Sequence, residues 1–399
     1  MMSMSEEVGK TDLERLLTKR AFIIPKYQRF YSWEKKEWED LWNDIDYLDE
    51  NSYHFFGTFI LKLSKKVRDG GDLIEIYELI DGQQRLATII MLVSVIIQEL
   101  KSIKTSLPED QKQELEDIIK EATKLFLRGK NINKLRMLGL DEEFFREYVI
   151  YGKFYEYITQ KACDSMEKIF RTPSQRRIFS CLQFFLKKVR EYRVRYENKY
   201  KESLLDLLAK IKNNLIAHIY FVEDLIQASH TFIVLNDRGK PLTNLERTKS
   251  QIMDYIIKLR SKDYEKKVEE IHKTFEKIYN LIQSINFRLR RYRIKLNEND
   301  LQRLHFILYV DESMLKKFRE WGLLKKASRK DAVGRYHRLL RKYFSKSFKK
   351  YRNRKIGHLI DLLMNYSNKL LEVFETVDCL AKISVEEVSD LERPIEREN

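Results

Sequence analysis

Residues 73–93, which read LIEIYELIDGQQRLATIIMLV, decide the fold of the first part of the chain. An apolar strand runs to Ile80, an Asp-Gly turn breaks it, and an apolar helix opens at Leu86. The first N–H groups of a helix have no partner inside it, and the helix dipole is positive at that end. Arg85 adds a forked donor array suited to phosphate. The junction therefore predicts an anion site, with phosphate as the best-fitting anion.

A purely structural interpretation stands beside this one. Asp81 could cap the helix and pair with Arg85, as happens at many helix starts. Gln83 and Gln84 are not needed for such a turn, and glutamine is only an average residue for beginning a helix. The residues themselves leave both interpretations open.

The composition favours a mainly helical protein with a small sheet. The 399 residues include 12 glycines and 5 prolines, and 34% are charged, which argues against a β-sandwich or a disordered chain. Three cysteines without CxxC spacing indicate a reducing cytosol, without a disulfide framework or a zinc cluster. The N-terminus is unlike a signal peptide, and the longest apolar run, 86–97, is too short to span a bilayer. We expect a soluble, cytoplasmic protein without a membrane partner.

Four apolar segments predict the strands of one sheet. They lie at residues 22–24, 54–63, 73–80 and 215–222. A charged turn around 68–72 joins the second and third segments as a hairpin. Nearly everything between about 100 and 212 has helical period, so the fold class is α+β, a small mixed sheet with a large helical insertion. The predicted domains are residues 1–255 and an all-helical, basic C-terminal domain at 256–399.

Several helix ends show capping residues. Ser32 is a good N-cap for the amphipathic helix that follows it, and Ser174 can cap a helix near residue 175. The Thr243–Glu246 string has the pattern of a capping box. Before it, we expect a helix at 226–235 that stops at a glycine.

The net charge of +15 is concentrated in one region. Residues 281–360 contain 23 Lys and Arg against 6 Asp and Glu, which favours contact with a polyanion. Segments 287–295 and 341–355 interleave basic and aromatic side chains, which suits phosphate contact and base stacking. The alternative is a solvated helical face over an aromatic core. The residues predicted to contact DNA are Arg288, Arg290, Arg291, Arg293, Lys295, Arg341, Lys342, Lys346, Lys349, Lys350, Arg352, Arg354 and Lys355.

Three polar strings, in this order, resemble one family closely. Residues 24–33 read IPKYQRFYSW, residues 80–86 read IDGQQRL and residues 235–242 read LNDRGKPL, with Phe-Gly-Thr at 56–58 after the first. Over roughly residues 10–255 the chain resembles the N-terminal domain of GmrSD-type, modification-dependent restriction systems, whose core is similar to ParB and sulfiredoxin. The resemblance implies a nucleoside-triphosphate-hydrolysing domain in prokaryotic anti-phage defence, coupled to DNA recognition and to an HNH-type nuclease.

The resemblance also implies a set of site residues and cofactors. The implied catalytic residues are Asp81, Gln83, Gln84 and Arg85, with Asp81 also as the metal ligand. The implied nucleotide-binding residues are Tyr27, Gln28, Arg29, Gly82, Thr88, Asn236, Arg238, Gly239 and Lys249. The implied cofactors are a nucleoside triphosphate, GTP or ATP, and Mg²⁺. Ala87 and the 246–249 string depart from the usual family pattern, which bears on turnover rate more than on binding.

The chemistry of the same side chains suits phosphoryl transfer, which needs positive charge around the phosphate and a positioned water. Arg85, Arg29 and Arg238 supply the charge. The amide of Gln83 or Gln84 can donate to and accept from water, and Asp81 can hold Mg²⁺. The chain has no GxxxxGK[ST] string, so NTPase activity would use this different site.

The resemblance, together with this chemistry, implies an NTP-binding and hydrolysing sensor subunit of an anti-phage restriction system. Its predicted partners are double-stranded DNA, with or without modified bases, and a separate nuclease subunit, and homo-oligomerisation is left open. We expect the nuclease on another chain, because no histidine after residue 256 has the strand context or adjacent carboxylate of an HNH site. The alternative is a non-catalytic, nucleotide-gated DNA-binding adaptor with a ParB-like fold. Cleavage of DNA by this chain itself ranks last.

Overall fold

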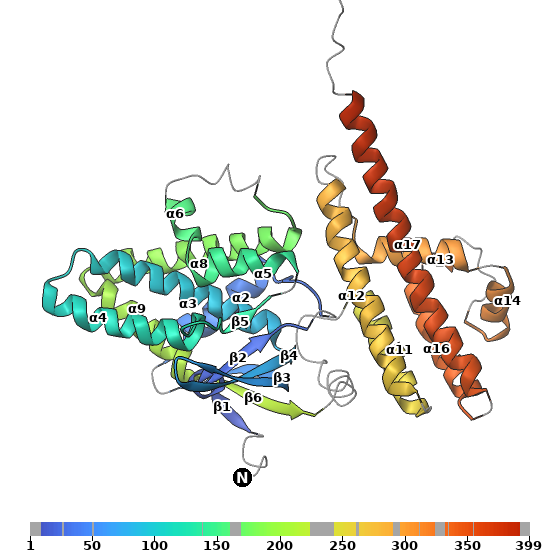
Figure 1. Ribbon diagram of the computed structural model, residues 1–399, viewed down its shortest axis with the longest axis horizontal. Helices are drawn as coiled ribbons and strands as arrows, with labels where there is room; N and C mark the ends of the chain where they lie inside the picture. The colour runs from blue at the N-terminus through green and yellow to red at the C-terminus, as the bar shows by residue number, and fades with distance from the viewer. Residues whose placement is uncertain are drawn as a thin grey trace, which may run out of the picture. The chain divides into compact units, whose positions relative to one another are not determined.

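Figure 1 shows the structure of the chain, a computed structural model. It describes residues 9–25, 28–49, 52–137, 139–159, 169–223, 243–260, 263–289, 296–310, 312–323, 332–333, 335–353 and 355–391. The chain divides into two compact units, residues 1–228 and 229–399. The predicted domain boundary at residue 255 stays a prediction.

The first unit contains a six-stranded mixed sheet with the order β1-β6-β3-β4-β2-β5 (Figure 1). The strands are β1 (Lys10–Asp12), β2 (Arg20–Ile23), β3 (His54–Asp69), β4 (Asp72–Asp81), β5 (Leu135–Arg136) and β6 (Leu215–Val222). β3 pairs antiparallel with β4 and parallel with β6, β2 pairs parallel with β4 and β5, and β1 pairs antiparallel with β6. The four predicted strands form the centre of the sheet. The edge strands β1 and β5 were missed, because such short segments show no alternating pattern.

The predicted hairpin is present, with longer strands than expected. Gly70 and Gly71 form its turn with φ values of 61° and 99°, the left-handed region that a two-residue hairpin turn requires. β3 continues beyond its predicted end at Leu63 as far as Asp69. This extension pairs only with β4 and is rich in charge, so the apolar pattern did not reveal it.

The helix after β4 lies in the core of the first unit. Every residue of α3 (Gln83–Lys104) from Leu86 to Ile97 is buried. By length and composition α3 could cross a membrane, but 78% of its apolar window is buried inside the unit. That burial is typical of the core helix of a soluble protein, as the sequence predicted.

Helices fill most of the chain between β4 and β6, which confirms the α+β class with a helical insertion. After α3 they are α4 (Glu109–Ala122), the π-helical η1 (Thr123–Leu127), α5 (Leu140–Phe144), the π-helical η2 (Phe145–Ile150), α6 (Phe154–Thr159), α8 (Pro173–Tyr196), the 3-10 turn η3 (Glu197–Lys199), α9 (Tyr200–Ala209) and the π-helical η4 (Lys210–Asn214). α1 (Leu13–Leu17) and α2 (Lys35–Asp46) precede the hairpin. α2 and α8 pack together through Trp38, Trp42 and Phe185, so the insertion shares one core with the sheet.

The predicted N-cap of α2 is wrong. Glu34 takes that position and forms a capping box with Glu37. Ser32 lies two residues earlier, and its backbone N–H donates to the side chain of Gln84 at 2.7 Å. Ser32 therefore serves a long-range contact that local sequence does not show.

The predicted N-cap of α8 is also wrong, by two residues. The hydroxyl of Thr172 accepts from the backbone N–H of Gln175 at 3.0 Å. Pro173 then occupies the first helical position, where its missing N–H costs nothing. Ser174 lies inside the helix and is buried.

The described part of the second unit is helical, as predicted. Its helices are α11 (Asn244–Leu259), α12 (Tyr264–Leu289), α13 (Glu298–Tyr309), α14 (Glu312–Glu320), α16 (Tyr336–Tyr351) and α17 (Ile356–Leu391). The predicted capping box is confirmed, because Thr243 and Glu246 each accept from the other's backbone N–H, at 3.2 and 2.7 Å. The helix expected at 226–235 lies outside the described residues.

Candidate functional site

The start of α3 is a tight junction between sheet and helix. Gly82 is its N-cap, with a left-handed φ of 95° and no side-chain capping bond. A Cβ at Gly82 would lie 2.5 Å from the ring of Phe59, so only glycine fits. The helix begins at Gln83, earlier than the predicted Leu86, and Asp81 does not cap it.

Arg85 clamps the hairpin to this helix. Its Nη2 donates to the carbonyl of Thr58 at 2.5 Å and to the carboxylate of Asp81 at 3.0 Å. The guanidinium lies against Gly57, where a Cβ would be 3.0 Å from Cζ, and 5.6 Å from the ring centroid of Phe59. The pairing of Arg85 with Asp81, which the structural interpretation predicted, is therefore present.

The loop after β2 lies against the same junction. Gln84 accepts from the backbone N–H of Ser32 at 2.7 Å and donates to the carbonyl of Phe30 at 3.3 Å. Gln28 donates to the carbonyl of Ile80 at 2.8 Å. The first two polar strings of the sequence thus meet at one place, as the family resemblance implied.

Thr88 belongs to a buried hydrogen-bond network. Its hydroxyl donates to the carbonyl of Gln84 at 2.8 Å and lies 2.7 Å from the hydroxyl of Tyr31. The indole N–H of Trp38 donates to the same Tyr31 hydroxyl at 2.9 Å. Burial raises the pKa of Tyr31 well above its ordinary value, so the phenol stays neutral. Sequence reasoning missed Tyr31 as a supporting residue, although it lies within the IPKYQRFYSW string.

Two buried polar atoms at the junction have no hydrogen-bond partner within the described residues. They are the amide oxygen of Gln83 and the Nε of Arg85. A buried polar atom without a partner costs about 1–3 kcal/mol, so a ligand that satisfies it gains affinity. Asp81 is partly exposed, and Arg29 follows Gln28 in the adjoining loop, also partly exposed. The junction therefore has both charge and unsatisfied polar atoms to offer a ligand.

The remaining implied nucleotide-binding residues stay a prediction. Tyr27, Asn236, Arg238 and Gly239 lie outside the described residues. Lys249 is buried in the second unit, its Nζ 5.7 and 5.9 Å from the ring centroids of Phe275 and Tyr279. Burial lowers its pKa to about 7.

A magnesium ion would find one carboxylate here. Among the described residues, no three His, Cys, Asp or Glu side chains are grouped so as to hold a metal ion. Mg²⁺ in phosphate-transferring sites commonly takes one or two carboxylates together with water and substrate phosphates. Asp81 alone therefore fits a metal that arrives with a nucleotide, and does not fit a resident metal.

Arg288 has a structural role. Its guanidinium donates to the buried carboxylate of Asp378 and to the hydroxyl of Ser284. This ion pair competes with a phosphate contact, and Arg288 as a DNA-contact residue stays a prediction. Of the other predicted DNA-contact residues, five lie outside the described residues: Arg290, Arg291, Arg293, Lys295 and Arg354.

Most aromatic side chains of α16 are core residues. Tyr343 stacks on Trp321, Phe344 packs edge-on to Tyr366, and Phe348 stacks on a tyrosine of α11. The burial of Tyr343, Phe344 and Phe348 agrees with the alternative of an aromatic core under a solvated face, whereas Tyr351 is partly exposed and Phe287 is exposed. The predicted DNA-contact residues with described positions on or after α16 are Arg341, Lys342, Lys346, Lys349, Lys350, Arg352 and Lys355.

Positive charge does gather on this helix. Burial, followed by Arg341, Arg338 and Arg247, lowers the pKa of His337. Burial and the same neighbouring arginines lower the pKa of Arg341 itself. These shifts mark a locally positive potential, which is what a phosphate backbone needs.

Comparison with known proteins adds a family to this geometry. No curated protein matches the chain. The family described as "GmrSD restriction endonuclease, N-terminal domain" matches residues 13–253, more than half of the chain. The match includes the hairpin, the junction and the whole helical insertion, and it leaves 254–399 outside. The chain belongs to the GmrSD restriction endonuclease N-terminal domain family.

Proposed function

We propose that this chain, a restriction-system component, binds and hydrolyses a nucleoside triphosphate, GTP or ATP, at the start of α3. The meeting of two distant polar strings around Arg85 is the observation that carries the proposal. Gln28 and Gln84 each bridge residues more than 50 positions apart, and the helix start between them presents positive charge. The unpartnered atoms of Gln83 and Arg85 supply further contacts.

Nucleotide binding exchanges the partners of Arg85. In the structure its Nη2 donates to Asp81, and a phosphate offers that donor a more highly charged acceptor. Asp81, freed from this pair, would hold Mg²⁺, and the ion when bound would neutralise charge on the phosphate oxygens. The amide oxygen of Gln83, which has no other partner within the described residues, would accept a hydrogen bond from the attacking water and orient it. The protein acts by position and charge, as phosphoryl transfer requires.

The test is phosphate release by the purified full chain with ATP or GTP and Mg²⁺. Arg85→Lys and Asp81→Asn keep side-chain size and should each lower kcat about a hundredfold or more. Lys35→Ala removes another i,i+4 ion pair, with Glu39 on α2, and should leave kcat within about twofold. Absence of turnover by the wild-type protein with every nucleotide would overturn the enzymatic proposal.

We also propose that the basic face of α16 contacts double-stranded DNA, so that nucleotide state is coupled to recognition by a separate nuclease subunit. Lys342 and Lys349, seven residues apart on that helix, are both exposed. Their double replacement by Glu should weaken DNA binding and flatten its salt dependence. The matched control reverses Lys273 and Lys277 on α12, which are also exposed. If both variants lose the same affinity for DNA, the net charge of the protein alone explains the loss.

The second candidate function is a nucleotide-gated adaptor without turnover. It is favoured by the extent to which Gln84, Arg85 and Thr88 already serve structural contacts. An adaptor would show nucleotide-dependent DNA affinity in the wild type and no phosphate release. Turnover that is lost in Asp81→Asn while DNA affinity stays nucleotide-dependent would exclude it.

A further inference from the structure

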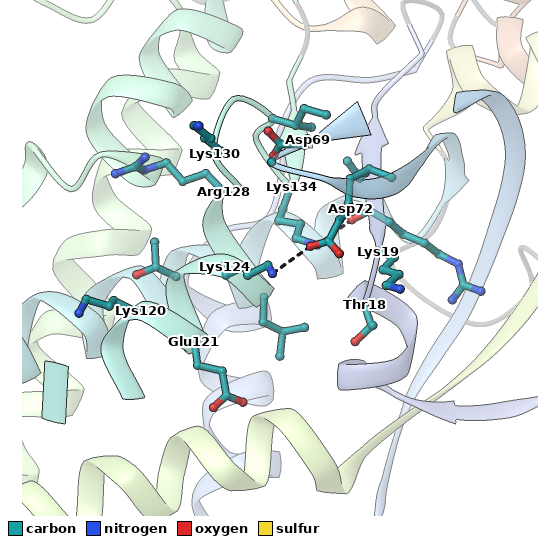
Figure 2. A pocket seen from close by; sticks show the side chains of 18 of the residues that line it. Thr18, Lys19, Asp69, Asp72, Lys120, Glu121, Lys124, Arg128, Lys130 and Lys134 are labelled. Carbon is teal, nitrogen blue, oxygen red and sulfur yellow. Dashed lines mark hydrogen bonds and ion pairs between the residues drawn. The ribbon is translucent and has the colours of Figure 1, made fainter. Parts of the chain in front are cut away.

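The first unit has a basic hollow that is separate from the start of α3. A pocket of about 730 Å³ lies between α1, β2, the hairpin turn, the end of α3, α4, η1 and the 128–134 segment (Figure 2). Its lining includes none of residues 81–85 and none of 28–32. The volume is within the range of small-ligand sites. The proposed nucleotide site therefore does not account for it.

Cations outnumber carboxylates in the lining of this pocket. The cations are Lys19, Arg20, Lys101, Lys120, Lys124, Arg128, Lys130 and Lys134, and the carboxylates are Glu14, Asp69, Asp72, Glu116 and Glu121. Every carboxylate already has a partner: Lys212 for Glu14 and Glu121, Lys104 for Glu116, Lys124 for Asp72, and Asn131 for Asp69. Within the described residues, five cations have no carboxylate in ion-pair contact: Lys19, Lys101, Arg128, Lys130 and Lys134. The pocket thus carries uncompensated positive charge.

Asp72 occupies the centre of the lysines. Figure 2 shows Lys124 and Lys134 pointing toward its carboxylate, and Lys124 Nζ lies 3.0 Å from Oδ2. Lys124, with smaller contributions from Lys19 and Lys134, lowers the pKa of Asp72. One carboxylate among three lysines leaves an excess of positive charge that a phosphate beside it would neutralise.

Lys134 is the buried member of this group. Its Nζ donates to the carbonyls of Leu17 and Arg20, at 2.8 and 3.0 Å, and the residue is 7% exposed. Burial, and then the charge of Lys124, lowers its pKa to about 8. The fold thus keeps an ammonium group here although burial and like charge oppose it.

The backbone that carries these cations is held in unusual but fixed conformations. Lys19 has a left-handed φ of 54°, and η1, which ends just before Arg128, is a π-helical turn of a kind often found at functional sites. A Cβ at Gly129 would lie 2.1 Å from Asp69 Oδ2, so the 128–133 turn packs tightly on the hairpin. Asp69 holds that turn through the backbone N–H of Asn131 at 2.8 Å. The basic side chains therefore start from rigid positions.

We propose that this pocket is an anion site that takes the phosphate groups of a nucleotide-sized ligand. The lysines around Asp72 would bind the phosphates. The apolar side chains of Ala21, Ile74 and Ile132 in the same lining would face an uncharged part of the ligand. The phosphates belong either to a free nucleotide or to a nucleic-acid strand, and the test separates these sources.

The test is direct binding of ATP, inorganic triphosphate and a short single-stranded DNA to the full chain, in wild-type and Arg85→Lys backgrounds. Lys101→Glu with Lys130→Glu should weaken binding roughly tenfold, a change of about 1.4 kcal/mol. The matched control, Lys35→Glu with Lys36→Glu on the exposed start of α2, should leave affinity within about twofold. Asp72→Asn should strengthen binding, because it removes the competing carboxylate.

Each result decides the proposal. If the pocket variants weaken the binding of ATP and triphosphate, the ligand is a free nucleotide. If they weaken the binding of the DNA alone, the ligand is a nucleic-acid strand. Equal changes in the pocket and control pairs, loss of all binding in Arg85→Lys, or weaker binding in Asp72→Asn would overturn the site. Turnover at the start of α3 is not needed for any of these outcomes, so the two proposals fail separately.

Discussion

The start of α3 and the basic pocket use cations of the same unit in opposite ways. At the start of α3, Arg85 is held by Asp81 and by the carbonyl of Thr58, and the neighbouring glutamines bind backbone groups. In the pocket, five cations have no ion-paired carboxylate within the described residues, and burial or like charge lowers the pKa of Lys101 and Lys134. At the start of α3, most polar groups make contacts within the protein. In the pocket, much of the positive charge has no ion-pair partner among the described residues and can meet a ligand.

The DGQQR motif and the group of cations without ion-paired carboxylates in the pocket therefore lie at different places of the same unit. The DGQQR string joins strand, helix and loop, so its residues carry structural roles whatever they bind. Replacing them affects folding and function together, whereas pocket cations can be changed with little structural cost. Experiments that compare the two regions must therefore measure stability beside binding.

The largest expected effect is at Gly82. Gly82→Ala places a Cβ 2.5 Å from the Phe59 ring at a φ of 95°, and should lower the free energy of unfolding by about 3 kcal/mol or more. Gly71→Ala is the matched control, since its φ is 99° with no atom within 4 Å of the added Cβ. It should cost only about 1–2 kcal/mol. Urea unfolding of both variants measures the difference, and equal losses would show that the start of α3 is not tightly packed.

The central sheet and the start of α3 could be predicted from sequence because their signals are local. Apolar runs gave four strands, and the Asp-Gly turn placed the boundary between strand and helix within a few residues. Arg85 donates to the carbonyl of Thr58 in β3, next to the register shift between Phe55 and Gly57. No local pattern in the sequence shows this contact. The helix and glycine expected between 226 and 239 lie outside the described residues, so the third string stays a prediction.

The basic pocket was not predicted, and the reason is physical. Its cations come from three separated stretches of sequence, at residues 19–20, 101 and 120–134. Each segment alone looks like an ordinary solvated face, because surface lysines are common. The distribution of charge along the sequence favoured residues 281–360 as the polyanion contact, because the excess of Lys and Arg is contiguous there. Only the fold shows which cations of the first unit share one hollow.

A second prediction concerns Lys134 and pH. Its folded pKa of about 8 is below the ordinary lysine value, so above pH 8 the unfolded chain binds more protons and stability should rise with pH up to about 10.4. The rise should be on the order of 3 kcal/mol. Lys134→Met should make the rise smaller by this amount, since Lys101 and Lys249 also have lowered pKa values and keep their part of it, and Lys130→Met, which changes an exposed lysine of the same pocket, should leave the rise unchanged. Thermal or urea unfolding across that pH range measures the slope, and identical slopes would refute an uncompensated buried charge.

The smallest effect, and the one that best separates architecture from binding, is at Gln84. Gln84→Ala removes its bonds to Ser32 and Phe30 and should cost about 1–3 kcal/mol of unfolding free energy. Gln113→Ala, on the exposed face of α4, should cost less than about 0.5 kcal/mol.

If Gln84 only joins the loop to the helix, nucleotide affinity should fall in step with stability and recover when the loop is restrained by added osmolyte. If its amide also orients water, kcat should fall further than stability explains, with KM nearly unchanged. If the variant loses stability without any change in kcat or KM, the role of Gln84 is purely structural.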